Sequence, residues 1–156
     1  MKVSEIMTQG TVTDQANDTL TVAAQKMWDQ QTGSLLVVAE GSERLIGIIT
    51  ERDILKAAAQ GLDLGATHVH EVMGKEPVTV HPSTSLRQAA QIMAERWIRH
   101  LPVVENSRLV GIVSQRDLTG VLAGALNEPD ALAQLVEASE LAREKRLKRI
   151  HPGPWD

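Results

Sequence analysis

The sequence of 156 residues contains no cysteine, phenylalanine or tyrosine, and its large aromatic side chains are Trp28, Trp97 and Trp155. The absence of cysteine excludes thiol nucleophiles, iron–sulfur clusters and cysteine-ligated zinc, and it fits a reducing compartment. Three tryptophans are too few for a nucleic-acid surface built from stacked aromatic rings. The core must therefore be built from aliphatic side chains.

A basic excess and long apolar runs are also missing. The 16 Lys and Arg residues are outnumbered by 20 Asp and Glu residues, which gives a net charge of -4 and no general attraction to phosphate backbones. No apolar run approaches the roughly 18 residues of a membrane-spanning helix, and the start MKVSEIMTQG lacks the apolar segment of a signal peptide. We expect a soluble, cytoplasmic protein with no nucleic-acid or membrane partner.

The sequence does contain two copies of one pattern. The stretch VSEIMTQGTVTDQANDTLTVAAQKM from Val3 aligns with VHEVMGKEPVTVHPSTSLRQAAQIM from Val69 at a shift of 66 residues. After a turn that is two residues longer in the first copy, RLIGIITERDIL aligns with RLVGIVSQRDLT at a shift of 64 residues. We expect a first repeat over 1–65, a second repeat over 66–126, and a C-terminal helix with a frayed tail over 127–156.

Each copy predicts the same order of elements, β-α-β-β-α. A short extended piece near Val12 or Val78 precedes an amphipathic helix, in which Trp28 or Trp97 is expected in the core or at a dimer interface. Two β-branched runs then predict a hairpin, and a second helix begins near Thr50 or Ser114. One unit leaves a sheet face uncovered, so the sequence predicts an α/β fold of two units related by a pseudo-two-fold axis, with ligand clefts where the units meet.

The motif with the most chemical content is Thr-Glu-Arg-Asp over 50–53, with its copy Ser-Gln-Arg-Asp over 114–117, at the junction of a strand and a helix. One interpretation is a capping box, in which hydroxyl and carboxylate satisfy the first turn of the helix. The other is a ligand site. A hydroxyl, free helix N–H groups and a guanidinium suit a phosphate, and the carboxylate suits the two hydroxyls of a ribose. A cap does not require the arginine that both copies contain.

These segments, IRHLPVV, LVGIVSQRD and LIGIITERD above all, resemble the tandem CBS domains named after cystathionine β-synthase, over about residues 3–126. The resemblance implies a compact pair of repeats, often dimeric, whose clefts bind adenosine-containing regulatory ligands such as AMP, ADP, ATP, NAD or S-adenosylmethionine. It implies that Asp53 and Asp117 hold ribose hydroxyls and that Thr50 and Ser114 bind phosphate. Arg52 and Arg116 complete the two motifs.

The resemblance also implies which residues frame the adenine. One cleft is expected to contain Val12, Thr13, Ser34 and Leu35, and the other Val78, Thr79, His100, Leu101 and Pro102. The two copies differ at the start of one strand, where the second has Arg99 and His100 and the first has Gly33 and Ser34. We therefore expect unequal clefts, with Arg99 and His100 favouring phosphate in the one that contains Asp117.

The sequence offers no motif for catalysis or for metal binding. His68 and His70 are close together, but the converging ligands that a metal site needs are not evident, and no nucleophile with a matching base can be named. We expect a non-enzymatic regulatory module that requires no cofactor and forms a homodimer. The alternatives are a structural or interaction protein with empty clefts, and an accessory subunit of a separate enzyme.

Overall fold

The computed structural model describes residues 1–11 and 13–125. The first half contains β1 (Thr13–Gln15), α1 (Leu20–Asp29), β2 (Ser34–Val38), β3 (Leu45–Thr50) and α2 (Glu51–Ala59). The short helix α3 (Val69–Val72) and strand β4 (Gly74–Lys75) follow, and the second half contains α4 (Leu86–Arg96), β5 (His100–Glu105), β6 (Arg108–Ser114) and α5 (Gln115–Ala125). The predicted helix and tail over 127–156 lie outside the described residues, as does Val12.

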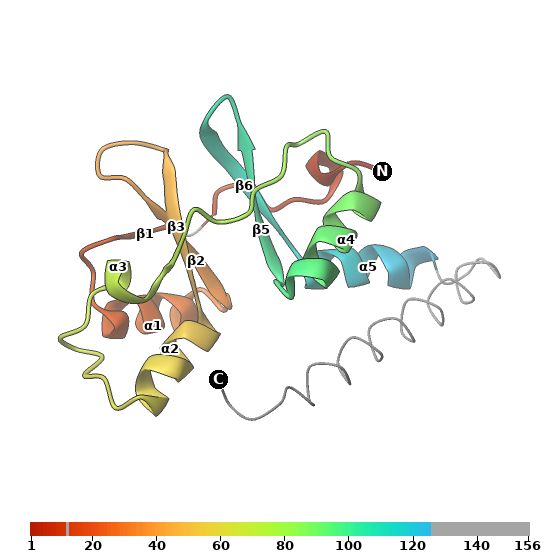
Figure 1. Cartoon of the computed structure of the whole chain (residues 1–156). Helices are drawn as coiled ribbons and strands as arrows, with labels where there is room; N and C mark the ends of the chain where they lie inside the picture. Colours follow the sequence, from red (N-terminus) through yellow and green to blue (C-terminus); the bar gives the residue numbers. More distant parts are fainter. Residues whose placement is uncertain (12, 126–156) are drawn as a thin grey trace.

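The two halves have the same strand pattern. In the first sheet, β1 pairs in parallel with β2, which pairs antiparallel with β3, and β3 pairs antiparallel with β4. In the second sheet, β5 and β6 form the antiparallel hairpin. Isolated bridges from Val80 to Val103 and from Thr8 to Ile112 take the places of β1 and β4. The predicted α/β fold of two similar units is confirmed (Figure 1).

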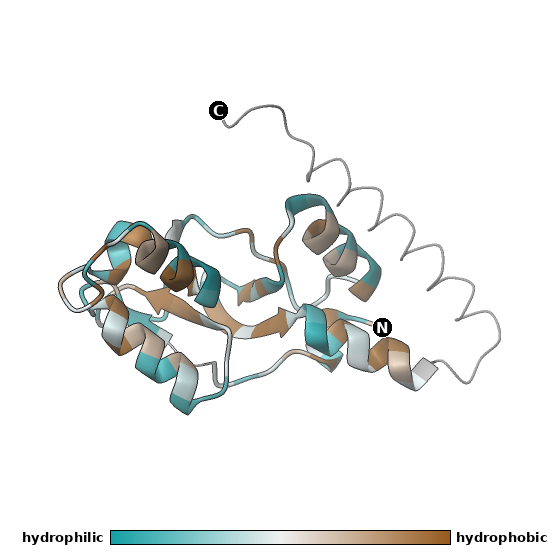
Figure 2. Ribbon diagram, turned by 90° about the horizontal axis from the view of Figure 1, so that it is seen from below, coloured by the Kyte–Doolittle hydropathy of each residue, from teal (hydrophilic) through white to brown (hydrophobic). Residues whose placement is uncertain are grey.

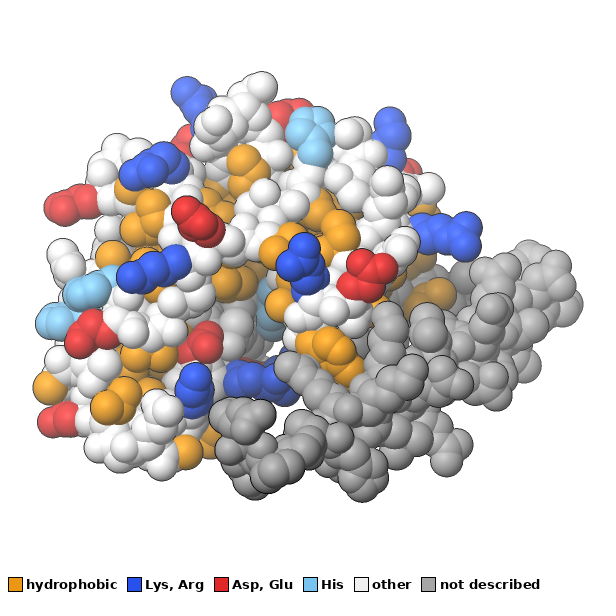
Figure 3. All heavy atoms as spheres, in the orientation of Figure 1, with side chains coloured by type: hydrophobic (Ala, Val, Ile, Leu, Met, Phe, Trp, Pro, Cys, Tyr) orange, Lys and Arg blue, Asp and Glu red, His pale blue; other side chains and the backbone are white. Residues whose placement is uncertain are grey.

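Each half has its own aliphatic core beneath its helices. The first contains Leu20 and Met27 of α1 with strand residues such as Leu35, and the second contains Met93 of α4 with strand residues such as Leu101. Figure 2 shows the apolar strands lying between helices that carry both polar and apolar residues, and Figure 3 shows acidic and basic side chains interspersed on one face of the molecule. No helix in the described part of the chain is long and apolar enough to cross a membrane.

Trp28 and Trp97 do not occupy the core positions that helical periodicity allows. Trp28 is 75% exposed, because Leu20, Ala23 and Met27 form the buried face of α1. Trp97 lies just past α4, in a left-handed conformation with φ 57°, and is also exposed. A core position is therefore wrong for both, and the interface alternative stays a prediction.

The first residues of the two repeats are exchanged between the cores. Val3 packs in the second core, and its N–H donates to the Thr84 carbonyl at 2.8 Å. Val69 packs in the first core, and its N–H donates to the Asp18 carbonyl at the same distance. In Figure 1 the N-terminus accordingly lies beside α4, and α3 lies beside the first sheet. This exchange brings residues 8–11 to the region where the halves meet.

Candidate functional site

A pocket of about 810 Å³ is lined by residues from both halves of the molecule. Its walls come from the N-terminal segment, the end of α1 with the loop to β2, and the beginnings of α2, β5 and α5. The lining residues are Thr8, Gly10, Thr11, Met27, Trp28, Gln30, Gln31, Thr32, Gly33, Ser34, Leu36, Glu51, Arg99, His100, Ile112, Ser114, Gln115, Arg116, Asp117 and Thr119. The pocket therefore lies where the sequence predicts a cleft.

Both copies of the T/S-x-R-D motif form the capping box that the sequence allows. The Thr50 N–H and hydroxyl donate to Asp53 Oδ2 at 2.8 and 2.9 Å. The Ser114 N–H and hydroxyl donate to Asp117 Oδ2 at 2.6 and 2.7 Å. Capping thus uses one oxygen of each carboxylate. Within the described residues, no hydrogen bond reaches the other oxygen of either aspartate.

The whole second copy of the motif lines this pocket, whereas the first copy contributes only Glu51. Ser114, Arg116 and Asp117 belong to its wall, whereas Thr50, Arg52 and Asp53 do not. Asp117 Oδ1 therefore offers an acceptor beside a helix N-terminus, and the exposed side chain of Arg116 lines the same pocket. This combination of acceptor, N–H groups and guanidinium suits a ligand that carries both hydroxyls and an anionic group.

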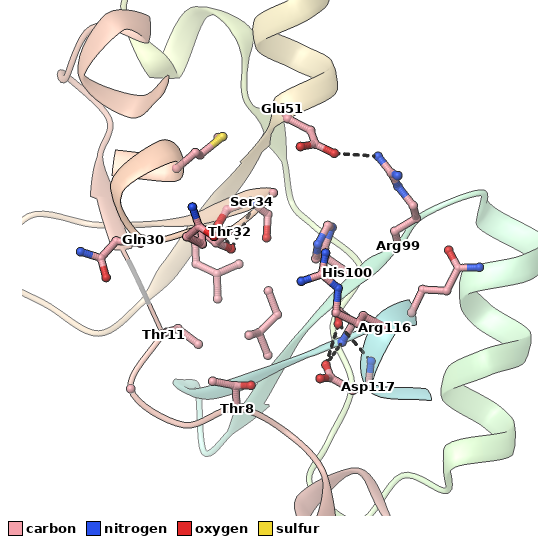
Figure 4. Close-up of a pocket in the computed structure, with 18 of the residues that line it drawn as sticks. Thr8, Thr11, Gln30, Thr32, Ser34, Glu51, Arg99, His100, Arg116 and Asp117 are labelled. Atoms are coloured by element: carbon pink, nitrogen blue, oxygen red, sulfur yellow. Dashed lines mark hydrogen bonds and ion pairs between the residues drawn. The ribbon is translucent and has the colours of Figure 1, made fainter. Parts of the chain in front are cut away.

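Ser34 supplies a buried hydroxyl on the opposite wall. It is 4% exposed, and its Oγ has no hydrogen-bond partner within the described residues. Its position at the start of β2 follows from the pairing of Ser34 with Thr50 on β3. In Figure 4 Ser34 faces the pocket across from His100. An unpaired buried hydroxyl is costly, and a polar group of a ligand in this pocket would satisfy it.

His100 lies between charged side chains. Burial, followed by the positive charge of Arg99, lowers the pKa of His100, although the carboxylates of Glu51 and Asp117 partly oppose this. Arg99 Nη2 donates to Glu51 Oε1 at 3.3 Å, an ion pair that joins the two halves of the molecule. At neutral pH the pocket thus presents a neutral imidazole and a guanidinium that already has a carboxylate partner.

The remaining predicted residues that the structure describes do not line this pocket. Leu35, Leu101 and Pro102 are fully buried in the sheets, and their contact with an adenine stays a prediction. Thr13 and Thr79 are exposed, as is Val78, and none of the three contributes to the wall.

The sequence analysis also assigns Ser34 and His100 to different clefts, and the structure places both in one pocket. Each residue begins a strand, β2 or β5, and the starts of both strands contribute to the wall of this pocket.

Several lining residues are missing from the sequence prediction, among them Thr8, Thr11, Gln30, Thr32 and Glu51. Thr8 and Thr11 reach the pocket because the N-terminal segment crosses to the second half, where the Thr8 N–H donates to Ile112 O at 2.9 Å. Glu51 is the second residue of the first motif and aligns with Gln115 in the second motif. This difference in charge between the two copies is the one sequence signal that could have identified Glu51.

The histidines of the linker have structural partners. The Nδ1 atoms of His68 and His70 lie 2.8 and 3.0 Å from the carbonyl oxygens of Asn17 and Ala16. The described residues contain no group of three or more His, Asp or Glu side chains placed to hold a metal ion.

The comparisons with known proteins agree with this architecture. The CBS domain model matches residues 3–60 and 69–124. The CBS domain-containing protein YhcV of Bacillus subtilis is 44% identical over 117 residues, which covers 74% of this chain and 81% of YhcV.

Two solved structures illustrate the likeness in three dimensions. The CBS domain protein PAE2072 from Pyrobaculum aerophilum, complexed with AMP, has 29% identity and a TM-score of 0.73, covering 88% of this chain and 99% of its own. The CBS domain pair of protein MJ0100, in complex with 5-methylthioadenosine and S-adenosyl-L-methionine, has 30% identity and a TM-score of 0.72, covering 78% and 98%. With two matches to the family model over most of its length, the chain belongs to the CBS domain family and carries the domains as a tandem pair.

Proposed function

We propose that this protein is a non-catalytic regulatory module that binds an adenosine-containing ligand in the pocket lined by Ser34 and Asp117. The observation that carries the proposal is the pair of unused polar atoms in the pocket, the buried Ser34 hydroxyl and Asp117 Oδ1. The proposal is supported by the similar CBS proteins PAE2072, complexed with AMP, and MJ0100, complexed with 5-methylthioadenosine and S-adenosyl-L-methionine.

The chemistry of the wall suggests a role for each group. Asp117 Oδ1 accepts hydrogen bonds from the ribose hydroxyls, while Oδ2 continues to cap α5. The N-terminus of this 11-residue helix and the Arg116 guanidinium stabilise negative charge on the ligand. The Ser34 hydroxyl pairs with a polar group of the ligand that enters between the halves. None of these proposed roles involves a chemical reaction of the ligand. The proposed outcome of binding is a change in the conformational equilibrium of the protein.

A second ligand site is proposed at the other copy of the motif. Thr50, Arg52 and Asp53 repeat the groups of the described pocket, but the residue that precedes β2 is Gly33, whereas the residue that precedes β5 is Arg99. We expect this cleft to bind a phosphorylated ligand more weakly, because the Arg99 guanidinium belongs to the lining of the described pocket. The two aspartates therefore provide a matched pair of positions for testing the proposal.

The test is to titrate the protein with adenosine, AMP, ADP, ATP, NAD and S-adenosylmethionine. Calorimetry measures the affinity for each ligand, and thermal unfolding measures the stability that each ligand adds. A ligand at about a hundred times its Kd adds roughly 2.7 kcal/mol of stability. Asp117→Asn keeps the shape of the cap but removes the charged acceptor. We expect it to weaken binding about ten- to a hundredfold while costing at most about 1 kcal/mol of stability.

Asp53→Asn is the matched control, because it makes the same change in the same capping box outside the described pocket. It should cost similar stability and leave the tighter site intact. If no ligand of the panel binds, or if Asp117→Asn leaves the affinity of every ligand unchanged, the assignment of this pocket is wrong. The absence of binding would favour the alternative, a structural or accessory protein in which the two capping boxes only cap helices. The complete capping geometry of both boxes is the observation that favours this alternative.

For transmitting the signal we propose a homodimer. The helices α1 and α2 pack against each other, and each carries a very exposed large apolar side chain, Trp28 and Leu55. Exposed apolar surface of this kind commonly marks an interface. A ligand that binds one arrangement of the repeats more tightly would change the population of that arrangement, and with it this interface or an interface with another protein.

Light scattering should give the mass of a dimer at tens of micromolar protein. Leu55→Ser should shift the measured mass toward that of the monomer. A monomeric parent protein contradicts the proposal.

A further inference from the structure

Glu51 is an acidic side chain in a pocket for which an anionic ligand is proposed. Its carboxylate lies among the lining residues, paired with Arg99 at 3.3 Å, and both side chains are more than half exposed. Arg99 comes from the strand start of the second half, and Glu51 from the first turn of α2 in the first half. The pair thus neutralises the guanidinium that the pocket would otherwise offer to a phosphate.

The position of the pair suggests which part of a ligand it meets. Figure 4 shows Arg99 and Glu51 at one end of the pocket and Asp117 toward the other, with His100 between them. If Asp117 holds the ribose hydroxyls, the group attached to the ribose can extend toward His100, Arg99 and Glu51. A phosphate that approaches Arg99 must either displace Glu51 or remain close to its negative charge.

The chain itself contains the neutral version of this residue. Glu51 aligns with Gln115 of the second copy, which has the same length and hydrogen-bonding capacity but no charge. The backbone positions correspond as well, since the Glu51 N–H donates to Gly33 O and the Gln115 N–H donates to Arg99 O. The α2 helix therefore does not need the carboxylate in order to begin at this residue.

Resting on the proposed binding of an adenosine-containing ligand, we propose that Glu51 selects the charge of the ligand's 5′ substituent. It disfavours ligands increasingly as their negative charge rises, from adenosine through AMP to ATP. A substituent that carries both a cation and an anion, as in S-adenosylmethionine, can place its cation near Glu51 and its carboxylate near Arg99. Glu51 therefore acts as a specificity-determining residue rather than as an anchor for the ligand.

The experiment compares Glu51→Gln with the unchanged protein, using adenosine, AMP, ATP and S-adenosylmethionine in calorimetric titrations. Because the carboxylate is exposed, its effect is moderate and screened by salt. We expect the affinity for AMP to rise about threefold and that for ATP about tenfold, with adenosine unchanged and S-adenosylmethionine weakened. These gains should shrink at about 1 M salt, where the screening length falls to roughly 3 Å.

Glu40→Gln is the control, because it makes the same change in net charge in the exposed turn between β2 and β3, outside the pocket lining. It should leave all four affinities unchanged. If Glu51→Gln alters adenosine and ATP equally, or alters neither, the selection proposal is wrong while ligand binding stands. If none of the four probes binds the unchanged protein, the proposed function fails first and the selection proposal with it.

Discussion

The Asp14 carboxylate lies 2.6 Å from the Lys26 ammonium, at positions where the second repeat has Val80 and Ile92. Asp14 is 1% exposed, and its Oδ2 has no hydrogen-bond partner among the described residues. Burial raises the pKa of Asp14, while Lys26, which also contacts Asp18 at 3.0 Å, opposes that rise. One copy of the fold therefore holds an ion pair where the other packs two apolar side chains.

The first prediction is that the ion pair can be replaced by the apolar pair of the other repeat, but not broken. Lys26→Ile alone leaves the Asp14 carboxylate buried without its cation and should cost about 3 kcal/mol of unfolding free energy. The double variant Asp14→Val, Lys26→Ile should be within about 1 kcal/mol of the unchanged protein, or more stable. Urea denaturation measures both. A double variant as unstable as the single one would show that the apolar pair does not fit the first core.

The second prediction concerns Gly111, on which the exchanged N-terminal segment packs. A Cβ atom at this position would lie 2.8 Å from the Thr8 carbonyl oxygen and 3.0 Å from Met7 Sδ. Gly111→Ala should cost about 1–3 kcal/mol, because backbone must move to accommodate the methyl group. Since Thr8 lines the pocket, the same variant should also weaken the binding of AMP.

Gly120→Ala is the matched control for this substitution. A Cβ atom at Gly120 in α5 meets nothing within 4 Å, so the change should stabilise the helix by up to about 1 kcal/mol. The unfolding temperature should therefore fall in Gly111→Ala and rise in Gly120→Ala, relative to the unchanged protein. Equal stability of the two would mean that the close approach of Thr8 to β6 is not maintained in solution.

The internal repeat made the fold predictable, because aligned residues occupy equivalent places in the two halves. Thr8 and its counterpart Gly74 pair with equivalent residues of β6 and β3, and Asp14 and Val80 pair with β2 and β5. The exchange of the N-terminal segment was not predictable in this way. Val3 and Val69 fit either core equally well by composition, and the choice depends on which route the chain takes between the sheets.

The candidate site was predicted in part for the same reason. The motif ending in Asp117 gave the polar groups on one wall, and their local capping geometry depends on residues three apart. The opposite wall depends on tertiary packing. No local signal in the sequence shows that Ser34 is left without a partner or that Glu51 reaches Arg99.

The third prediction is a dependence of stability on pH that arises from His100. Burial and the charges of Arg99 and Arg116 lower the pKa of His100 in the folded protein, although Glu51 and Asp117 oppose this. The unfolded chain therefore takes up a proton at this residue first as the pH falls. The folded state should lose stability as the pH falls below about 6.5, until the folded-state pKa is passed. Urea denaturation of His100→Gln should show a smaller loss over the same range; an identical pH profile would rule out this contribution.

The last prediction is that Arg99 distinguishes phosphorylated from unphosphorylated adenosine and makes the two clefts unequal. Arg99 lines the described pocket together with Gly33, the residue that aligns with it in the first repeat, so only one of the two equivalent positions provides a guanidinium there. A guanidinium can hold two phosphate oxygens at once, so its loss affects AMP directly. Its loss also leaves Glu51 without its cation, which adds repulsion between that carboxylate and the phosphate.

Titration with AMP should resolve a tight and a weak site, or one occupied site. Arg99→Ala should weaken the tight site about tenfold or more while adenosine binding changes little. Arg87→Ala, on the exposed part of α4, removes the same charge away from the pocket and should leave both ligands unaffected. Two identical sites that Arg99→Ala does not alter would show that the difference between the repeats has no consequence for binding.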